Sequence, residues 1–316
     1  MKKIKLTKTG KLLIAGVIAL IIIVIGAIKI NQKIQYQKTY EYKLLEKGYE
    51  INQVKELEKL YSNKRLDYIL TLDKDDNLIS IAKEKYYIDK HLEEYLAYIK
   101  ENKCNNSTAI LKINTYTNYD FYSHDIEAKN LSNTMIVNKF YKLKEDFVPN
   151  NLVDISNLYA WGTDNKAQKE ALDAFIRMQK DCLDQTGLKL LINSAYRSYK
   201  EQEEVYNDYV KKNSEEYADT IAARPGHSEH QTGLSLDIFS TKDPKIKTFG
   251  ESDTFKWLKD NAYKYGFIIR YPKDKEDITG FNYEPWHYRY VGLEIAKEIY
   301  EEDITYEEYY EYYLNK

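Results

Sequence analysis

Two short stretches of the chain bring together residue types that can hold a metal ion. The first, residues 226–237, offers an imidazole at His230 and a carboxylate at Asp237 in the pattern Ser-x-His-x-x-Gly-x-x-x-Asp. The second, Glu-Pro-Trp-His at 284–287, adds the imidazole of His287 and a spare carboxylate. Two imidazoles and one carboxylate suit a catalytic zinc ion, because three ligands leave the fourth coordination position for water. The sequence therefore predicts a zinc site formed by His230, Asp237 and His287.

The residues around the first stretch predict the elements that would position its two ligands. From Leu234 onward, apolar and polar residues alternate, as they do in a strand with one packed face. This alternation places Asp237 on the side where a metal ion could lie. His230 precedes the strand, and Gly233 gives the backbone the freedom to bring both side chains to one point.

The second stretch predicts a strand that must bend. Residues 284–291 are expected to form this strand, and residues 267–271 an earlier one. Residues three apart fall on opposite faces of a flat strand, so Glu284 and His287 can meet only where the chain bends. Pro285 favours such a bend.

Upstream of both stretches, the sequence predicts a helix, a strand and a second helix. The first helix is expected to begin near Asp164 as its N-cap and to end at Gly187, followed by a short buried strand over 188–192. A capping box, Ser-x-x-Glu at 198–201, then starts the next helix. Arg197 therefore lies at a strand-to-helix turn.

The N-terminus predicts a membrane anchor. The chain is almost wholly apolar from Leu12 to Ile30, which is about the length that a bilayer core requires. Five lysines precede this segment, so the positive-inside rule would keep residues 1–11 in the cytoplasm and send the rest of the chain outside. A cleaved signal peptide is the alternative, but the apolar segment is long for one and residues 29–32 offer no small-residue cleavage site. We expect a single-pass membrane protein with residues 12–30 as its uncleaved anchor.

Residues 31–129 are expected to form a helical stalk and linker. Short helical patterns recur in a polar, Lys- and Glu-rich background. Later the pattern turns strand-like and loop-like, for example over 109–114 and 135–138. A partner-binding module is the alternative to a stalk. The second domain is expected to begin near residue 130 and to include residues 130–316.

The acidic, tyrosine-rich C-terminus predicts a final helix. Thr305 and Glu308 have the spacing of a capping box, so the segment that follows is expected to dock as a helix. A tail that binds a partner is the alternative.

Composition excludes one broad class of partner and leaves the state of the cysteines open. A net charge of −3, with 31% charged residues of both signs, provides no broad basic field, so no nucleic-acid partner is expected. Cys104 and Cys182 match none of the metal-site spacings. We expect two thiols, and a disulfide between them is the alternative.

In combination, these motifs resemble the zinc D-alanyl-D-alanine carboxypeptidases of the VanY type, in a group with the VanX dipeptidases and the amino-terminal domain of sonic hedgehog. The resemblance spans residues 130–312 and lies in Ser-Ala-Tyr-Arg-Ser at 194–198, Ser-Glu-His-Gln-Thr-Gly-Leu-Ser-Leu-Asp at 228–237 and Glu-Pro-Trp-His-Tyr-Arg-Tyr-Val-Gly at 284–292. The commonest family form has Ala at the position of Ser235, a change that we do not expect to harm zinc binding. The resemblance implies an α+β fold. A small central antiparallel sheet would be flanked by helices and carry zinc at its face. The transmembrane helix and helical stalk expected from the N-terminal sequence would precede this fold.

The resemblance also implies a role for each residue of the site. His230, Asp237 and His287 would hold zinc, Glu284 would be the general base, and Arg197 would face the scissile carbonyl. The chemistry asks for the same residue types, because zinc lowers the pKa of bound water toward ~7 and a free carboxylate can take its proton. The alternatives are a helix-end salt bridge for Arg197 and, for Glu284, an outer carboxylate that orients an imidazole.

Three further residues, Ser228, Gln202 and Trp286, are candidates for shaping the pocket around the terminal D-residue and its carboxylate. Each has an alternative role that involves no substrate. These roles are capping for Ser228, a place on the helix surface for Gln202 and core packing for Trp286.

We therefore expect a membrane-anchored, extracytoplasmic zinc carboxypeptidase that removes the terminal D-alanine from peptidoglycan stem peptides. The anchor fits this function, since the wall substrate lies outside the membrane. Cleavage of an L,D bond in tetrapeptide stems and endopeptidase cutting of cross-links are alternatives that depend on the shape of the pocket. A zinc-bearing but inactive binding domain is a third alternative, against which the presence of both Glu284 and Arg197 argues.

Overall fold

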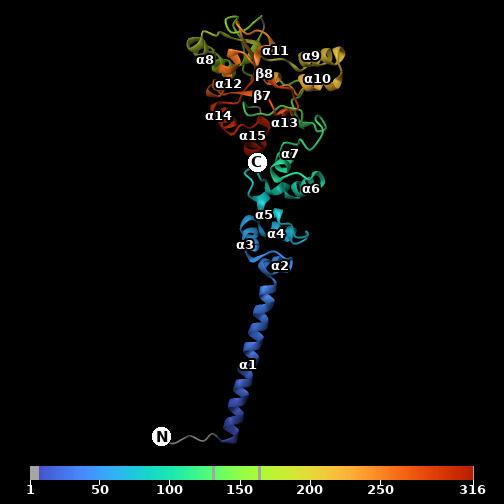
Figure 1. Cartoon of the computed structure of the whole chain (residues 1–316), viewed down its shortest axis with the longest axis vertical. Helices are drawn as coiled ribbons and strands as arrows, with labels where there is room; N and C mark the ends of the chain where they lie inside the picture. Colours follow the sequence, from blue (N-terminus) through green and yellow to red (C-terminus); the bar gives the residue numbers. More distant parts are fainter. Residues whose placement is uncertain (1–6, 130–131, 163–164, 316) are drawn as a thin grey trace. The chain divides into compact units, whose positions relative to one another are not determined.

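The computed structural model describes residues 7–129, 132–162 and 165–315 and contains two compact units, Met1–Leu92 and Glu93–Lys316 (Figure 1). The first unit is helical, and its elements are α1 (Lys8–Gln37), α2 (Tyr40–Glu46), α3 (Ile51–Leu60), α4 (Asn63–Ile69), α5 (Asn77–Ala82) and the 3-10 turn η1 (Asp89–His91). Helix α6 (Leu92–Asn102), which was expected in the stalk, and helix α7 (Asn106–Asn114), which was not expected, open the chain segment that goes on to form the strands. A functional domain boundary near residue 130 stays a prediction.

Helix α1 contains the apolar segment of the N-terminus. It has 30 residues, begins behind the N-cap Thr7, and buries none of its residues. A helix of this length extends about 45 Å, more than a bilayer core requires. Among the described residues it is the one helix whose length and composition suit a membrane span, and a signal sequence would have the same properties.

Helices α2 to α5 share a small apolar core. Their inward residues recur at helical spacing, and the side chains of Glu50 and Gln53 form a capping box at the start of α3. The fully or almost fully buried members of this core are Leu44, Val54, Leu57, Leu66, Ile69, Leu78 and Ile81. The short helical patterns expected after the N-terminal segment are thereby confirmed.

The expectation of a strand-like run over 109–114 is wrong, because these residues lie in helix α7. The side chain of Asn105 accepts a hydrogen bond from the backbone nitrogen of Thr108 at 2.8 Å, which caps the helix. Ala109, Ile110 and Ile113 are buried, a spacing that matches one face of a helix. Residues 135–138 form no strand either, although they are buried.

Four strands form the central sheet in the order β5-β6-β8-β7, with every neighbouring pair antiparallel. Their bounds are β5 (Leu190–Ser194), β6 (Ser235–Ser240), β7 (Phe267–Tyr271) and β8 (Glu284–Tyr290). Two pairs of short strands lie elsewhere: β1 (Ile126–Glu127) beside β2 (Tyr141–Lys142), and β3 (Leu152–Asp154) beside β4 (Lys166–Gln168). The small antiparallel sheet implied by the family resemblance is thus present.

The two faces of the central sheet carry different residue types. One face of the sheet packs against helix α8 (Lys169–Thr186), and together they form an apolar core. The buried residues of this core include Phe175, Met178, Ile192, Leu236, Ile238 and Phe267. Burial of each such side chain contributes about 1.5–3 kcal/mol. Because side chains alternate along a strand, the opposite face receives the intervening residues Asp237, Arg270, His287 and Arg289.

Helix α8 is shorter at its start than expected. It begins at Lys169 behind the N-cap Gln168, and Asp164, the expected cap, lies outside the described residues. Gly187 ends the helix with φ of 75°, a left-handed conformation that glycine adopts without strain. The strand that follows starts at Leu190, two residues later than expected.

The remaining elements connect and cover the sheet. They are α9 (Tyr199–Lys212), α10 (Glu215–Ile221), η2 (Glu229–Thr232), α11 (Ile246–Phe249), α12 (Asp253–Asn261), η3 (Ala262–Tyr265), α13 (Glu276–Thr279), α14 (Leu293–Glu302), α15 (Tyr306–Tyr309) and the π turn η4 (Tyr310–Leu314). The predicted capping boxes at Ser198 and Thr305 are both formed. The C-terminal helix docks as expected, since Tyr306 and Glu307 are buried.

Candidate metal centre

Asp237 and His287 face each other across two paired strands. Residue 237 of β6 is the direct partner of residue 287 of β8 in the antiparallel register, so both side chains leave the same face of the sheet. Asp237 Oδ1 lies 3.2 Å from His287 Nδ1. The strand register alone therefore brings together two of the three predicted ligands.

His230 reaches the same point from the turn before β6. It lies in the 3-10 helix η2, which Gly233 closes with φ of 67°. His230 Nδ1 lies 2.6 Å from the backbone oxygen of Ala195, so the proton of the neutral ring belongs on Nδ1. Nε2 is then left as a lone-pair donor, and it faces Asp237 Oδ2 at 3.5 Å.

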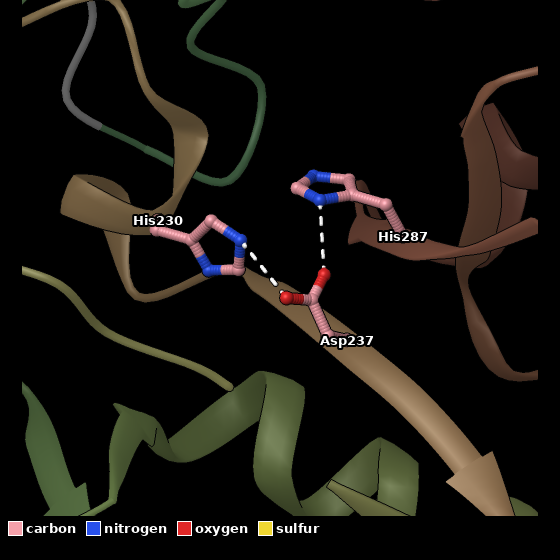
Figure 2. A group of neighbouring side chains, drawn as sticks. All are labelled: His230, Asp237 and His287. Atoms are coloured by element: carbon pink, nitrogen blue, oxygen red, sulfur yellow. Dashed lines mark ion pairs between the residues drawn. The ribbon is translucent and has the colours of Figure 1, made fainter. Parts of the chain in front are cut away.

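The three ligand atoms fit a zinc ion. One ligand atom from each of His230, Asp237 and His287 lies within 4.8 Å of the others, and Figure 2 shows the carboxylate of Asp237 between the two imidazoles. Within the described part of the chain, the buried Asp237 Oδ1 has no hydrogen-bond donor, although burying a polar atom without a partner is costly. Two nitrogens and one carboxylate oxygen suit zinc and leave a position for water.

Burial and charge shift the pKa values of the ligands in a way that a cation would relieve. Burial lowers the pKa of His230. For His287, burial works in the same direction, but the neighbouring carboxylates of Asp237 and Glu229 outweigh it and raise the pKa to about 9. A metal ion replaces such a proton, since imidazole ligands bind metals in the neutral form.

Glu284 joins the centre because β8 is irregular. Ile269 pairs with Tyr288 and Tyr271 with Glu284, so that Arg270 alone stands opposite three residues of β8. This bulge turns the chain, and Glu284 Oε2 lies 3.7 Å from His287 Nδ1. The predicted bend after Glu284 is confirmed.

Glu284 has the environment of a proton acceptor rather than of a surface acid. Its side chain is 13% exposed. Burial raises the pKa of its carboxyl to about 8, the charge of Asp237 adds to this rise, and His287 and Arg197 oppose it. A carboxylate with a raised pKa beside a metal site is suited to accept a proton from water near neutral pH.

Arg197 is fixed by its neighbours at the turn between β5 and α9. Its Nη1 donates to Gln202 Oε1 at 2.8 Å and its Nη2 to Ser194 Oγ at 3.0 Å. Its backbone nitrogen donates to the backbone oxygen of His230 at 3.1 Å, which ties the turn to a predicted metal ligand. These contacts position a guanidinium whose charge lowers the pKa of Glu284 and of His230.

The three residues predicted to shape the pocket have structural contacts of their own. Ser228 caps η2 by accepting a hydrogen bond from the backbone nitrogen of His230 at 3.3 Å. Gln202 is buried rather than on the helix surface, and its Nε2 donates to the backbone oxygen of Ala223 at 2.7 Å. Trp286 stacks on Phe239 with 6.3 Å between the ring centroids. Contact of these residues with a substrate stays a prediction.

The sequence reasoning missed a buried charge network behind the centre. Glu229 is 1% exposed, and its Oε1 accepts hydrogen bonds from Arg270 Nε at 2.8 Å and Arg289 Nη1 at 2.9 Å. Arg270 also binds Glu307 of α15 through both terminal nitrogens. Arg289 follows His287 by two residues, so the period of a strand could have placed it on the ligand face.

The charges of this network balance. Burial on its own would raise the pKa of Glu229, but Arg270 and Arg289 outweigh it and hold the pKa well below its usual range. Two carboxylates, Glu229 and Glu307, then face two guanidiniums. Buried ion pairs need this degree of hydrogen bonding to offset the cost of removing the charges from water.

The cysteines are both free thiols. Cys182 is buried in helix α8, where burial raises the pKa of its thiol to about 11. Neither takes part in the centre.

Comparison with known proteins points to one family. The model of the family described as "VanY: D-alanyl-D-alanine carboxypeptidase" matches residues 164–293. "Putative carboxypeptidase YodJ" of Bacillus subtilis (strain 168) is 39% identical over 228 residues, which cover 70% of this chain and 83% of YodJ. The "D-alanyl-D-alanine carboxypeptidase" of Enterococcus faecium is 35% identical over 187 residues, covering 57% of this chain and 58% of its own.

A solved structure supports the same placement. The LdcB LD-carboxypeptidase aligns with a TM-score of 0.54 and 39% sequence identity, covering 60% of this chain and 94% of the LdcB chain. The residues matched by the family model include all five predicted members of the site: Arg197, His230, Asp237, Glu284 and His287.

Proposed function

Because the chain belongs to the VanY family of D-alanyl-D-alanine carboxypeptidases, we propose that it removes the terminal D-alanine from peptidoglycan stem peptides. As a member of this family it is a zinc metallopeptidase. The observation that carries the proposal is the convergence of His230, Asp237 and His287 at the face of the sheet, with Glu284 3.7 Å from one of them.

Each residue of the centre has a chemical task in hydrolysis of the terminal amide. Zinc, when bound by the two histidines and Asp237, supplies Lewis-acid chemistry that makes water a nucleophile near neutral pH. Glu284 accepts the proton of the attacking water and passes it to the leaving amine. Arg197 stabilises the negative charge that develops on the carbonyl oxygen, a contribution on the order of 2.7–4 kcal/mol by analogy with an oxyanion-hole donor.

The proposed location of this chemistry is the outer side of the membrane, next to the cell wall. We propose that α1 is an uncleaved single-pass anchor, since 30 apolar-rich helical residues exceed the length of a bilayer core. The lysines before it favour an N-terminus inside and a catalytic domain outside. This orientation gives the enzyme access to peptidoglycan.

Cleavage of an L,D bond is the second candidate. It is supported by the likeness to the LdcB LD-carboxypeptidase, which at 39% identity covers most of that chain. The two activities differ in the configuration of the residue that precedes the scissile bond, and the proposed zinc ligands, base and guanidinium suit either reaction. The substrate therefore decides between them.

Defined stem peptides test the proposal. The full chain in detergent is incubated with tripeptide, tetrapeptide and pentapeptide stems, and the products are identified by mass spectrometry. We expect loss of one alanine from the pentapeptide, and no loss after chelation or in Glu284→Ala. Shortening of the tetrapeptide alone would replace the D,D assignment by the L,D one.

A matched variant separates catalysis from folding in this experiment. Glu284→Gln keeps the shape of the side chain but cannot accept the proton, so activity should fall to background while zinc remains bound. Stoichiometric zinc without hydrolysis of any stem by the wild type would favour a non-catalytic binding domain instead.

A further inference from the structure

Glu229 is a buried carboxylate that the proposed chemistry does not use. It stands directly before His230 in η2, and its two oxygens have different surroundings. Oε1 accepts hydrogen bonds from the guanidiniums of Arg270 and Arg289. Oε2 accepts a hydrogen bond from Ser235 Oγ at 3.2 Å and lies 3.9 Å from His287 Nε2.

His287 presents one ring nitrogen to the centre and the other to Glu229. Its Nδ1 lies 3.2 Å from Asp237 Oδ1. Its Nε2 is buried and has no hydrogen-bond partner among the residues that the structure describes. If Nδ1 binds a metal ion, the single proton of the neutral ring must lie on Nε2, and the acceptor it faces is the carboxylate of Glu229. A movement of about 1 Å brings the pair within hydrogen-bond distance.

We propose that Glu229 is a positioning residue of the metal centre, which keeps the proton of His287 on Nε2 and so directs the Nδ1 lone pair at zinc. The proposal rests on the metal site proposed above. Carboxylates that accept the second N–H of a metal-binding histidine orient the ring and make it a better donor. Here the carboxylate is itself held in place by two arginines.

The two carboxylate oxygens of Glu229 have different partners, which argues against a purely structural ion pair. A carboxylate that served only the arginines could turn both oxygens toward their guanidiniums, as Glu307 does toward Arg270. Glu229 instead gives one oxygen to both guanidiniums and leaves the other for Ser235 and His287. The hydroxyl of Ser235 donates a hydrogen bond to this second oxygen and so helps to fix its position.

Glutamine at position 229 would reverse the contact with His287. Its single amide oxygen is the only group that can accept from the two guanidiniums, so its NH₂ group would turn toward His287 Nε2. Two donors would then face each other. The proton of the ring would be displaced toward Nδ1, which would cost the ring its lone pair on the metal side.

The zinc dissociation constant tests the proposal without reference to activity. It is measured for the full chain in detergent by competition with a chromophoric chelator. We expect binding by Glu229→Gln to be about 10–100-fold weaker than that of the wild type. Glu307→Gln is the matched control, because it removes the same charge from the same network but its carboxylate contacts Arg270 and Asn138 rather than a histidine. It should keep the wild-type constant.

The outcomes separate this proposal from the proposed function. Equal zinc binding by the wild type and Glu229→Gln, or equal weakening by both variants, overturns the positioning role and leaves the enzyme assignment intact. Absence of zinc binding by the wild type overturns both.

A measurement on the wild type covers the case in which Glu229→Gln does not fold. Long-range ¹H–¹⁵N spectra of the zinc-loaded, histidine-labelled chain identify which nitrogen of each ring carries the proton. We expect His287 with a proton on Nε2 that is protected from exchange with solvent, and His230 with its proton on Nδ1. A proton on Nδ1 of His287, or an Nε2 proton that exchanges freely, overturns the proposal.

Discussion

Arg197 is held by side chains before any substrate arrives. The side chains of Gln202 and Ser194 accept hydrogen bonds from its two terminal nitrogens. The capping box that begins α9 fixes the turn that contains Arg197. Preorganisation of this kind makes a guanidinium effective, because the group need not reorient when charge develops on the carbonyl oxygen.

We predict that Arg197→Ala lowers kcat by about 10²–10³. Zinc content should not change, because Arg197 is not a ligand. Steady-state kinetics on the pentapeptide stem, with metal analysis of the same sample, measure both quantities. A loss of zinc that parallels the loss of rate would show instead that Arg197 supports the fold of the centre.

Lys139 lies away from the metal centre, and burial changes the pKa of its ammonium group. Its ammonium group donates to the backbone oxygen of Asp219 at 2.6 Å and lies over the rings of Phe121, Tyr122 and Phe281. Burial lowers the pKa of Lys139 to about 8, with a further lowering from Arg224, and the charge of Asp219 opposes both.

The lowered pKa predicts a pH dependence of stability. Between pH 8 and 10.5 the unfolded chain holds a proton that folded Lys139 has lost, so the free energy of unfolding rises with pH in this window. Below pH 8 the full cost of burying the charge is present. We expect a gain of about 2 kcal/mol between pH 8 and 10 that is absent from Lys139→Met. Urea unfolding of both proteins at these two pH values provides the test, and parallel pH profiles would contradict it.

At the scale of elements, the short turn η2 joins the proposed ligand His230 to strand β6. Gly233 ends this turn with φ of 67°, and a Cβ atom there would come within 2.7 Å of Leu152 Cδ2. Its backbone nitrogen donates to the oxygen of His230 at 3.1 Å. The position of this proposed metal ligand thus depends on a backbone conformation that only glycine adopts here without strain and crowding.

We predict that Gly233→Ala destabilises the protein and weakens zinc binding, because strain and crowding displace the turn that carries His230. Gly187→Ala is the control. It has a similar φ of 75°, with no atom within 4 Å of the added Cβ, so it should cost only the left-handed strain of about 1–2 kcal/mol. Unfolding free energies and zinc dissociation constants of both variants check this. Equal changes in the zinc dissociation constant of the two variants would contradict a specific role of Gly233 in positioning His230.

At the scale of the whole molecule, the chain combines a long apolar helix with a unit that contains the metal centre. None of the residues of α1 is buried, which is costly in water for a helix of this composition and favourable in a bilayer.

We predict that the protein stays in the membrane fraction after a carbonate wash and that a variant lacking residues 1–37 does not. Protease added to intact cells without a wall should digest the C-terminal unit if it lies outside, whereas residues 1–11 should be protected. An N-terminus of the mature protein beyond residue 30 would show that the apolar segment is a cleaved signal.

Sequence alone was sufficient to predict that the proposed metal ligands and the proposed base converge, and to predict the strands that bear them. His230 and Asp237 lie seven residues apart, close enough for local turn chemistry and strand alternation to predict their convergence. Helix caps such as Ser198 were equally accessible, since a capping box involves only neighbouring residues. The same local reasoning failed at 109–114, where a short, mainly apolar run does not distinguish a buried helix from a strand.

Only the tertiary structure decided how distant segments meet. The bulge that turns Glu284 toward His287 arises from the pairing of β8 with β7, which cannot be read from either strand separately. Glu229, Arg270, Arg289 and Glu307 come from four separate elements, and no spacing along the chain relates them. Their pairing is decided by burial: charges removed from water must find partners in three dimensions. Local motifs thus contain the proposed metal ligands, whereas the packing of the whole unit brings together the residues that hold them in place.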